Sequence, residues 1–375
     1  MSVIPLERDP ILRKAAELSA SDLILTAGHP VMVTVAGRLL AMEGTAVLTP
    51  GDSRRLVESF LTPSLLERFQ RDLELDMRFM LPGVAHFRVN AFIQRGHWAA
   101  AVRIVPLRIP LPSEIGLAPH VVERLLGLTR GLVLITGPTG SGKSTTIASL
   151  LEQINQTEPA RHVVTIEDPI EFHFESKHAV FEQREVGTDT RSYARGLKGA
   201  LRQMPHVIFV GEMRDLTSMA ISLTAAETGN LVISTMATQS ASQTVTRIID
   251  SFPAHQQSQI RSQLALTLRA VVSQVLLPRP DGKGRVAARE MMFVNQPIQN
   301  LIREDKIHQI PNVIATSVRD DMVRLDDSLA DLVDQGQASF DAAFPYFEDA
   351  ERRASVQKRH FRVMPIRDSR SPAQR

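Results

Sequence analysis

Short apolar runs recur along the second half of the chain, and each run ends in a polar or glycine-rich segment. The stretches between the runs are long enough for helices, an alternation typical of an α/β fold with a largely parallel sheet. Ligands of such sheets bind beyond the carboxyl ends of the strands, so these ends are the candidate sites for chemistry. The predicted strands are 131–136, 162–166, 206–210 and 230–235.

The first part of the chain has a different pattern, with short strands around one helical stretch near 51–71. The segments SDLILTAG and PVMVTVAGRLL precede this stretch, and HFRVNAFIQ and HWAAAVRIV follow it. Pro106, Pro110 and Pro112 then interrupt regular hydrogen bonding and give a semi-stiff connector. These features predict a separate, mixed α/β N-terminal domain.

The predicted organisation is an N-terminal domain at 1–106, a linker at 107–115, a second domain at 116–350 and a tail at 351–375. From about residue 255 the second domain is expected to be helical, apart from one hairpin around DGKG.

The charge is unevenly distributed. The formal net charge is +2, but residues 352–375 hold eight Lys and Arg and one acid, which leaves 35 basic against 40 acidic residues elsewhere. An acidic body argues against a protein that grips nucleic acid. The basic tail is expected to be disordered; contact with an acidic partner or an anionic membrane surface is the alternative.

The chain has no cysteine, which excludes disulfides and thiolate zinc sites. Its N-terminus lacks the apolar stretch of a secretory signal, and no apolar run approaches the ~20 residues that span a bilayer. The expectation is a cytoplasmic protein without a membrane span.

The strongest motif, GPTGSGKST at 137–145, fits the phosphate-binding pattern G-x-x-x-x-G-K-[ST] between a strand and a helix. Its backbone N–H groups would surround phosphate oxygens at the positive end of the helix dipole. Lys143 would reach the β- and γ-phosphates of ATP, and the Ser144 hydroxyl would ligate Mg²⁺. The predicted nucleotide-binding residues are Gly137, Pro138, Thr139, Gly140, Ser141, Gly142, Lys143, Ser144 and Thr145.

Two acidic strand ends are candidates for catalysis. VIFVGEMRD supplies Glu212, which would polarise the attacking water, while Gly211 occupies the position of the usual aspartate. Glu212 as a simple helix-start carboxylate is the alternative. VTIEDPIEF supplies Glu167 and Asp168, which fit a role near Mg²⁺ or the water; a surface turn is the alternative. Mg²⁺ would be held by Ser144, with Glu212 or Glu167 acting through water.

ATP hydrolysis also requires positive charge near the γ-phosphate in the transition state. Arg88 and Arg103 each lie within an apolar strand of the N-terminal domain, and Arg95 is a weaker candidate. Ordinary ion pairs with Glu74 or Asp76 are the alternative explanation.

Several of these segments together resemble the type IV pilus retraction ATPases, the PilT and PilU family of the secretion-ATPase superfamily. The resemblance covers residues 20 to about 345. It rests on SDLILTAG, FRVNAF, RGLVLITGPTGSGKSTT, VVTIEDPIEF, QREVGTDTRSYARGLKGALRQ, VGEMRD, TAAETG and NLIREDK.

The resemblance implies an N-terminal PAS-like α+β domain followed by a RecA-like P-loop ATPase domain with C-terminal helices. It implies a homo-hexamer in which nucleotide lies between the two domains. Arg88 and Arg103 match the arginines that complete the family's ATP site, and Glu167 and Glu212 match its Asp-box and Walker B acids.

The implied function is a cytoplasmic motor, docked at the inner membrane, that turns a platform protein and drives pilus retraction in twitching motility. A PilU-like nucleotide-binding accessory subunit with weak turnover, working with another PilT-like motor, is the alternative. A related secretion system and a DNA motor are further alternatives, and the acidic body argues against the last.

The chain departs from the family where Asn230 and Ala237 replace two histidines and where Gln299 replaces an arginine. A histidine at these two positions is expected to lie near the nucleotide and to relay its state to the next subunit. Gln203–His206 also depart from the family's Gln-Asp-Pro-Asp. These changes favour a specialised member of the family.

Overall fold

The computed structural model describes residues 4–363 except 36, 107, 158 and 283. The chain forms two compact units, Met1–Ile109 and Pro110–Arg375, and the division falls within the predicted linker. No helix in the described part of the chain is both long and apolar enough to cross a membrane.

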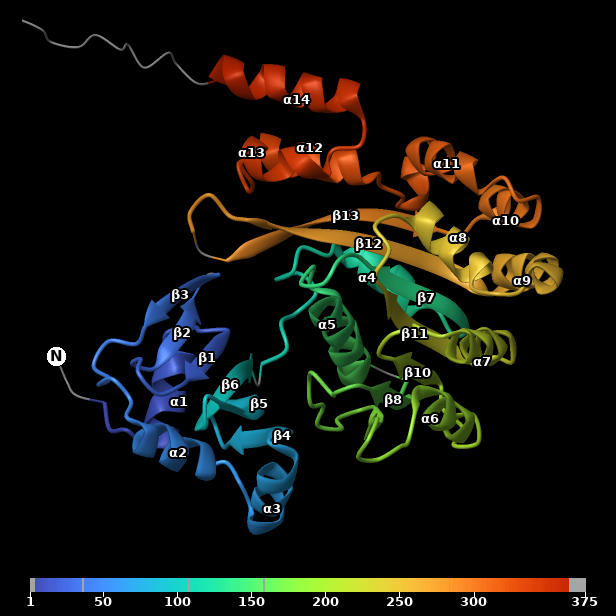
Figure 1. The fold of residues 1–375 in the computed structure, drawn as a ribbon. Helices are drawn as coiled ribbons and strands as arrows, with labels where there is room; N and C mark the ends of the chain where they lie inside the picture. The colour runs from blue at the N-terminus through green and yellow to red at the C-terminus, as the bar shows by residue number, and fades with distance from the viewer. Residues whose placement is uncertain (1–3, 36, 107, 158, 283, 364–375) are drawn as a thin grey trace, which may run out of the picture. The chain divides into compact units, whose positions relative to one another are not determined.

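The N-terminal unit is one antiparallel sheet with three helices (Figure 1). Its strand order is β3-β2-β1-β6-β5-β4. The helices are α1 Arg8–Glu17, α2 Pro50–Glu58 and α3 Pro63–Asp72; the strands are β1 Asp22–Leu25, β2 Met32–Val35, β3 Arg38–Ala41, β4 Glu74–Leu81, β5 Ala85–Gln94 and β6 His97–Pro106.

The sequence explains these elements locally. Strand β5 alternates buried and half-buried positions, the pattern of a strand with one face on the core. Helix α2 begins with a capping box, in which the Thr49 hydroxyl accepts from the Asp52 N–H and the Asp52 carboxylate accepts from the Thr49 N–H. Strand β4 is absent from the sequence-based prediction.

The second unit is an α/β sheet in the order β13-β12-β7-β11-β10-β8-β9, parallel except for the β12–β13 pair. Its strands are β7 Gly131–Thr136, β8 His162–Glu167, β9 Val180–Glu185, β10 Val207–Val210, β11 Leu231–Met236, β12 Leu268–Pro278 and β13 Arg285–Phe293. Strands β7, β10 and β11 are buried at every position, as central parallel strands require.

The predicted hairpin around 281–284 is confirmed, but it is larger than expected (Figure 1). Strands β12 and β13 occupy much of the region expected to be helical, and β9 was not predicted. Hydrophobic periodicity does not separate a short buried strand from a buried helix.

Helices cover the sheet of the second unit and follow it in the chain. They are α4 Pro119–Leu126, α5 Lys143–Gln156, α6 Tyr193–Ala200, α7 Leu216–Glu227, α8 Ala241–Asp250, α9 Ala254–Thr267, α10 Gln296–Arg303, α11 Ile310–Thr316, α12 Leu325–Asp334, α13 Phe340–Ala343 and α14 Ala350–Val363; the 3₁₀ turns are Ile307–Gln309, Val318–Asp320 and Phe344–Tyr346.

The expected disordered tail from residue 351 is wrong for its first part, because α14 occupies it; residues 364–375 lie outside the described residues. The Val356 side chain is fully buried in a small core that α14 shares with α12, α13 and the hairpin. Arg352 pairs with Asp327 and Arg359 with Asp334, so the acids of α12 neutralise part of the basic segment.

Removal of the Phe69 ring is expected to destabilise the N-terminal unit. Phe69 is the only fully buried residue of α3, and its ring meets Trp98 edge to face at 4.8 Å. Phe69→Ala should lower the free energy of unfolding by about 3–5 kcal/mol, because it leaves a cavity between helix and sheet. Trp98 is the single tryptophan of the chain, so its fluorescence during urea unfolding reports on this unit alone.

Arg68→Ala, on the exposed side of the same helix, is the control and should shift the transition little. Equal shifts for both variants would contradict the anchoring role of Phe69.

Candidate functional site

The phosphate loop joins the buried strand β7 to helix α5, as the motif predicts. Gly137, Gly140 and Gly142 all have positive φ, a conformation that favours glycine. A Cβ on Gly137 would lie 2.3 Å from the Gln274 carbonyl oxygen and 2.6 Å from Ser141 Oγ. Position 137 therefore has no room for a side chain.

The loop is held from behind by Gln274 on β12, a residue that the sequence analysis missed. Its side chain is 2% exposed; its Nε2 donates to the Ser141 carbonyl at 2.6 Å and its Oε1 accepts from Thr146 Oγ1 at 2.9 Å. One amide group thus joins the loop to the first turn of α5. No sequence pattern identifies it, because 133 residues separate Gln274 from Ser141.

Arg289 on β13 continues this network. It is 4% exposed, and its guanidinium donates to the Ile115 and Gly116 carbonyls at 2.7 and 3.3 Å and to Gln274 Oε1 at 3.4 Å. Burial lowers its pKa to about 10, so the group is still a cation at neutral pH. Arg289 links the segment that enters the second unit to the support of the phosphate loop.

The Lys143 ammonium lies over the loop and donates to the Gly137 and Pro138 carbonyls at 2.8 and 3.0 Å. Burial lowers its pKa, and the nearby charges of Glu212 and Glu171 act in the opposite direction. The predicted lysine and the predicted Glu212 therefore belong to one electrostatic site.

The loop fits a nucleotide phosphate on grounds independent of the motif. Ser141 Oγ is buried and has no hydrogen-bond partner among the described residues, a costly state for an isolated hydroxyl. Ser144 and Thr145 are half-buried in the first turn of α5, where backbone N–H groups lack helical partners. No three His, Asp or Glu residues of the described ranges converge on a metal position.

Glu167 ends strand β8 and is 5% exposed. Its Oε1 accepts from Thr165 Oγ1 at 2.7 Å and from Gln183 Nε2 at 3.4 Å; its Oε2 accepts from the Glu171 N–H at 3.4 Å. Burial raises its pKa to about 7 against these hydrogen bonds. The surface-turn alternative is therefore wrong for Glu167, whereas Asp168 is exposed.

The space around Gly211 is crowded, which accounts for the absence of the usual aspartate at this position. A Cβ at this position would lie 2.9 Å from the Tyr193 hydroxyl and 3.4 Å from Glu167 Cα. Burial raises the pKa of Tyr193, and the neighbouring charges of Asp168, Glu167 and Glu212 raise it further. Tyr193, which the sequence analysis did not single out, fills the space where an aspartate side chain would project.

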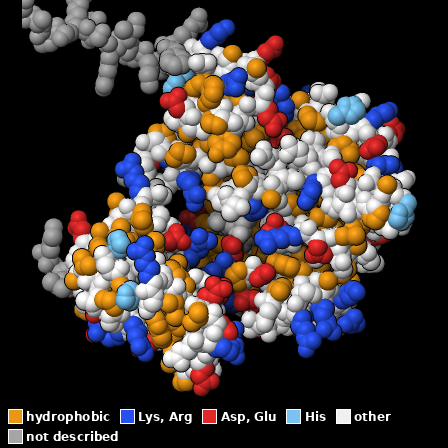
Figure 2. Space-filling view, in the orientation of Figure 1, with side chains coloured by type: hydrophobic (Ala, Val, Ile, Leu, Met, Phe, Trp, Pro, Cys, Tyr) orange, Lys and Arg blue, Asp and Glu red, His pale blue; other side chains and the backbone are white. Residues whose placement is uncertain are grey.

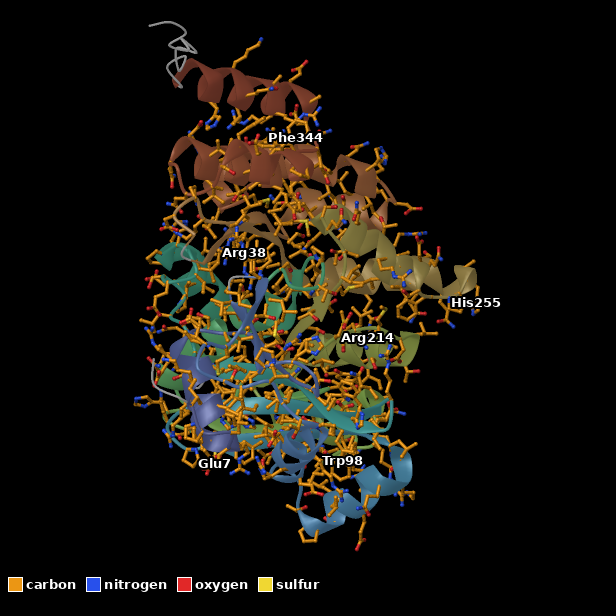
Figure 3. The ribbon with its side chains drawn as sticks, turned by 60° about the vertical axis from the view of Figure 1, so that its left-hand side comes forward. Glu7, Arg38, Trp98, Arg214, His255 and Phe344 are labelled. Carbon is orange, nitrogen blue, oxygen red and sulfur yellow. The ribbon has the colours of Figure 1, made fainter. Side chains whose placement is uncertain are left out.

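Glu212 follows Gly211 beyond the end of β10 and forms an ion pair of 2.7 Å with Arg214. Figure 3 labels Arg214, which lies just before α7. The residue that caps α7 is Asp215, whose carboxylate accepts from the Ser218 N–H at 2.9 Å. The helix-start explanation thus applies to Asp215 rather than to Glu212.

The arginines of the N-terminal unit form a row across its sheet. In the strand register, Arg88 lies opposite Arg78 on one side and Arg103 on the other, and Arg103 lies opposite Asp22. Arg103 pairs with Asp22 at 2.9 Å. The ion-pair alternative is therefore correct for Arg103, with Asp22 in place of the expected Glu74 or Asp76. Arg95 lies in the β5–β6 turn with positive φ.

The two departures from the family's histidines lie at opposite ends of β11. Asn230 precedes the strand, and its side chain donates to the Pro205 carbonyl at 2.7 Å. Ala237 follows the strand, next to the loop, where the Gly137 N–H donates to the Met236 carbonyl. Seven residue steps at about 3.3 Å each place the two positions about 23 Å apart. The expectation that position 230 lies near the nucleotide is therefore wrong.

The chain is similar to known proteins over most of its length. The family model of the type II/IV secretion system protein matches residues 113–344. The type IV pilus retraction ATPase PilT of Pseudomonas aeruginosa is 43% identical over 332 residues, which cover 88% of this chain and 94% of that protein. PilU of the same organism is 35% identical over 345 residues, 92% and 90% of the two chains.

A crystal structure of the pilus retraction motor PilT with bound ADP superimposes with a TM-score of 0.83 at 42% identity, covering 91% of this chain and 97% of that one. The α+β unit followed by an α/β nucleotide-binding unit is thus the architecture of the relatives as well. The chain belongs to the type II/IV secretion system protein family, among its PilT- and PilU-like ATPases.

Proposed function

We propose that the protein is the ATP-hydrolysing motor of type IV pilus retraction. The observation that carries the proposal is that the phosphate loop after β7 and the acids at the ends of β10 and β8 lie at the same edge of one parallel sheet, where the charge of Glu212 acts on Lys143. The identity to PilT over most of both chains supports the same function. The PilU-like alternative gains no further support, since the identity to PilU is lower.

Each step of ATP hydrolysis is assigned to different residues of the site. The phosphate loop binds the phosphates through backbone N–H groups, and Lys143 exchanges its carbonyl contacts for phosphate oxygens. Glu212, the less buried carboxylate, orients the attacking water. Mg²⁺ would be held by Ser144 and the nucleotide, with Glu212 or Glu167 acting through water, and it would neutralise developing charge on the phosphates.

The arginine row, which consists of Arg78, Arg88 and Arg103 of the N-terminal unit, is a source of the positive charge that ATP hydrolysis requires. These three residues lie in line across three neighbouring strands of the sheet, which gathers positive charge on one unit. The resemblance to the family implies that arginines of the N-terminal unit complete the ATP site, where positive charge stabilises the γ-phosphate in the transition state. We propose that Arg88 and Arg103 supply this charge and that hydrolysis thereby drives movement of the units.

The family further implies a homo-hexamer at the cytoplasmic face of the inner membrane, acting on a pilus platform protein. Movement of the units around the ring would turn the platform and release pilin subunits. Another PilT-like motor is a second candidate partner, since Ala237 beside the loop has no side-chain group to report the nucleotide state.

Glu212→Gln should abolish ATP turnover and leave ATP binding intact, because the amide keeps the shape but loses the charge that orients water. A phosphate-release assay and titration with a fluorescent ATP analogue measure the two properties. Glu123→Gln, on the exposed side of α4, is the control. Turnover above one-tenth of the parent rate would contradict the assignment.

The same variant tests the cellular role. Expressed in place of the native chain, Glu212→Gln should leave pili that extend but retract poorly, whereas Glu123→Gln should retract normally. Normal retraction with Glu212→Gln, in a strain lacking other retraction motors, would contradict the proposed function.

Arg88→Ala and Arg103→Ala should each lower kcat at least tenfold, because the transition state loses a positive charge. Circular dichroism checks that both variants fold. Arg38→Ala, an exposed arginine of the same sheet, should keep the parent rate. Unchanged kcat in both variants would refute the role of the arginine row.

Glu167 should make the stability of the second unit depend on pH. Its folded-state pKa of about 7 exceeds the ordinary 4.5, so the folded state binds the proton more tightly than the unfolded chain. This contribution is complete below about pH 4.5 and is lost as the pH rises towards 7. Relative to the parent, Glu167→Gln should therefore gain about 2–3 kcal/mol of unfolding free energy between about pH 5 and pH 8.

Guanidinium unfolding followed by circular dichroism measures the change. Glu290, whose pKa burial also raises to about 7, is present in both proteins and cancels in the difference. A gap between parent and variant that does not depend on pH would contradict the raised pKa.

A further inference from the structure

A second concave region of the surface lies beside α6, away from the residues assigned above. It is an open hollow of about 440 Å³ lined by Arg184, Thr190, Arg191, Arg195, Gly199 and Arg202. Figure 2 shows Lys and Arg side chains gathered at the lower right of this face, in the region of α6. No lining residue belongs to the phosphate loop or to the acids around Tyr193.

No ion pair with an acid among the described residues involves the four arginines of the hollow. Lys198 on the same helix forms none with them either. Arg184 donates only to a backbone carbonyl, that of Asp189, at 3.2 Å. The Asp189 carboxylate instead accepts from the Glu185 N–H at 2.8 Å.

The local structure brings these charges together. Helix α6 begins at the Ser192 cap, so Arg191 precedes the helix and Arg195 lies in its first turn. Arg202 lies in the turn just beyond the end of α6 and lines the same hollow as Arg195. Gly196 and Leu197 are buried and face the sheet, which leaves the arginines exposed.

Gly199 leaves space beside the helix for the Arg184 guanidinium. Arg184 reaches the helix from the edge strand β9, and a Cβ at position 199 would lie 3.1 Å from its Nη1. A glycine at this helical position costs about 1 kcal/mol in propensity, but it lets the guanidinium lie against the helix.

Four uncompensated guanidinium groups around one open hollow repel one another and concentrate anions. Guanidinium matches phosphate oxygens in bidentate geometry, better than a lysine ammonium does. The lining has no aromatic side chain on which a nucleobase would stack, which argues against single-stranded nucleic acid. We propose that this hollow binds a phosphate-bearing anion, either free or as a phospholipid headgroup.

The test compares two full-length chains that both carry Lys143→Ala, so that the phosphate loop does not contribute. One adds Arg191→Gln, Arg195→Gln and Arg202→Gln. The matched control adds Arg13→Gln, Arg247→Gln and Arg319→Gln, which remove the same charge from exposed arginines elsewhere. Tripolyphosphate binding is measured by calorimetry at about 150 mM salt, where long-range attraction is screened.

We expect the hollow variant to bind tripolyphosphate at least tenfold more weakly than the control variant. Cosedimentation with phosphatidylglycerol vesicles, against phosphatidylcholine vesicles, separates the two sources of phosphate. Binding to both tripolyphosphate and phosphatidylglycerol supports a headgroup site, and binding to tripolyphosphate alone supports a soluble ligand.

Equal losses in the two variants, or no binding by the control variant, would overturn the proposal. Tighter binding of polyglutamate than of tripolyphosphate would also overturn it in favour of an acidic protein partner. If circular dichroism shows that the triple variant does not fold, the single charge reversal Arg202→Glu replaces it, with Arg319→Glu as its control and the same criteria.

Discussion

The close approach of strand β12 to the phosphate loop is the constraint on which the nucleotide site depends. The Gln274 carbonyl leaves no space for a Cβ at Gly137, and the Gln274 amide holds both Ser141 and Thr146. A loop supported in this way presents its N–H groups in a fixed arrangement, and preorganised dipoles are worth more than mobile ones. Arg289 extends the support to Ile115 and Gly116, at the entrance of the second unit.

Burial distinguishes the two candidate catalytic acids. Glu167 lies almost entirely inside the protein, and its pKa is raised to about 7; Glu212 is partly exposed and pairs with Arg214. Two carboxylates with different environments are suited to different tasks near one phosphate. Tyr193 packs beside Gly211, because its hydroxyl lies where a side chain at position 211 would project, next to Glu167.

Basic side chains are paired with acids to different extents at three places in the molecule. The basic residues of α14 find acids on α12, and this pairing accompanies a small apolar core around Val356. In the arginine row of the N-terminal unit, Arg103 at one end pairs with Asp22. The arginines that line the hollow beside α6 form no ion pair with an acid among the described residues. The hollow beside α6 therefore retains positive charge for an external anion.

The sequence alone determined the identity of the phosphate loop, the four central strands of the second unit and the candidate acids Glu167 and Glu212. These features are local: a motif, an apolar run and the residue after it lie next to one another in the chain. It also determined the hairpin at 281–284 and, through its motifs, the family. The prediction failed at β4, β9 and the beginning of α14, where the pattern is short or strongly charged. It also failed at most of β12 and β13, where an apolar run fits a buried helix as well as a strand.

Only the tertiary structure decided which distant residues meet. It placed Gln274 and Arg289 behind the loop and Tyr193 against Gly211. It also aligned Arg88 with Arg78 and Arg103 across the N-terminal sheet. Asn230 and Ala237 lie at opposite ends of β11. The physical reason is that strand order, direction and register decide these contacts. Hydrophobic periodicity specifies which face of an element is buried, but it does not specify the partner that covers it.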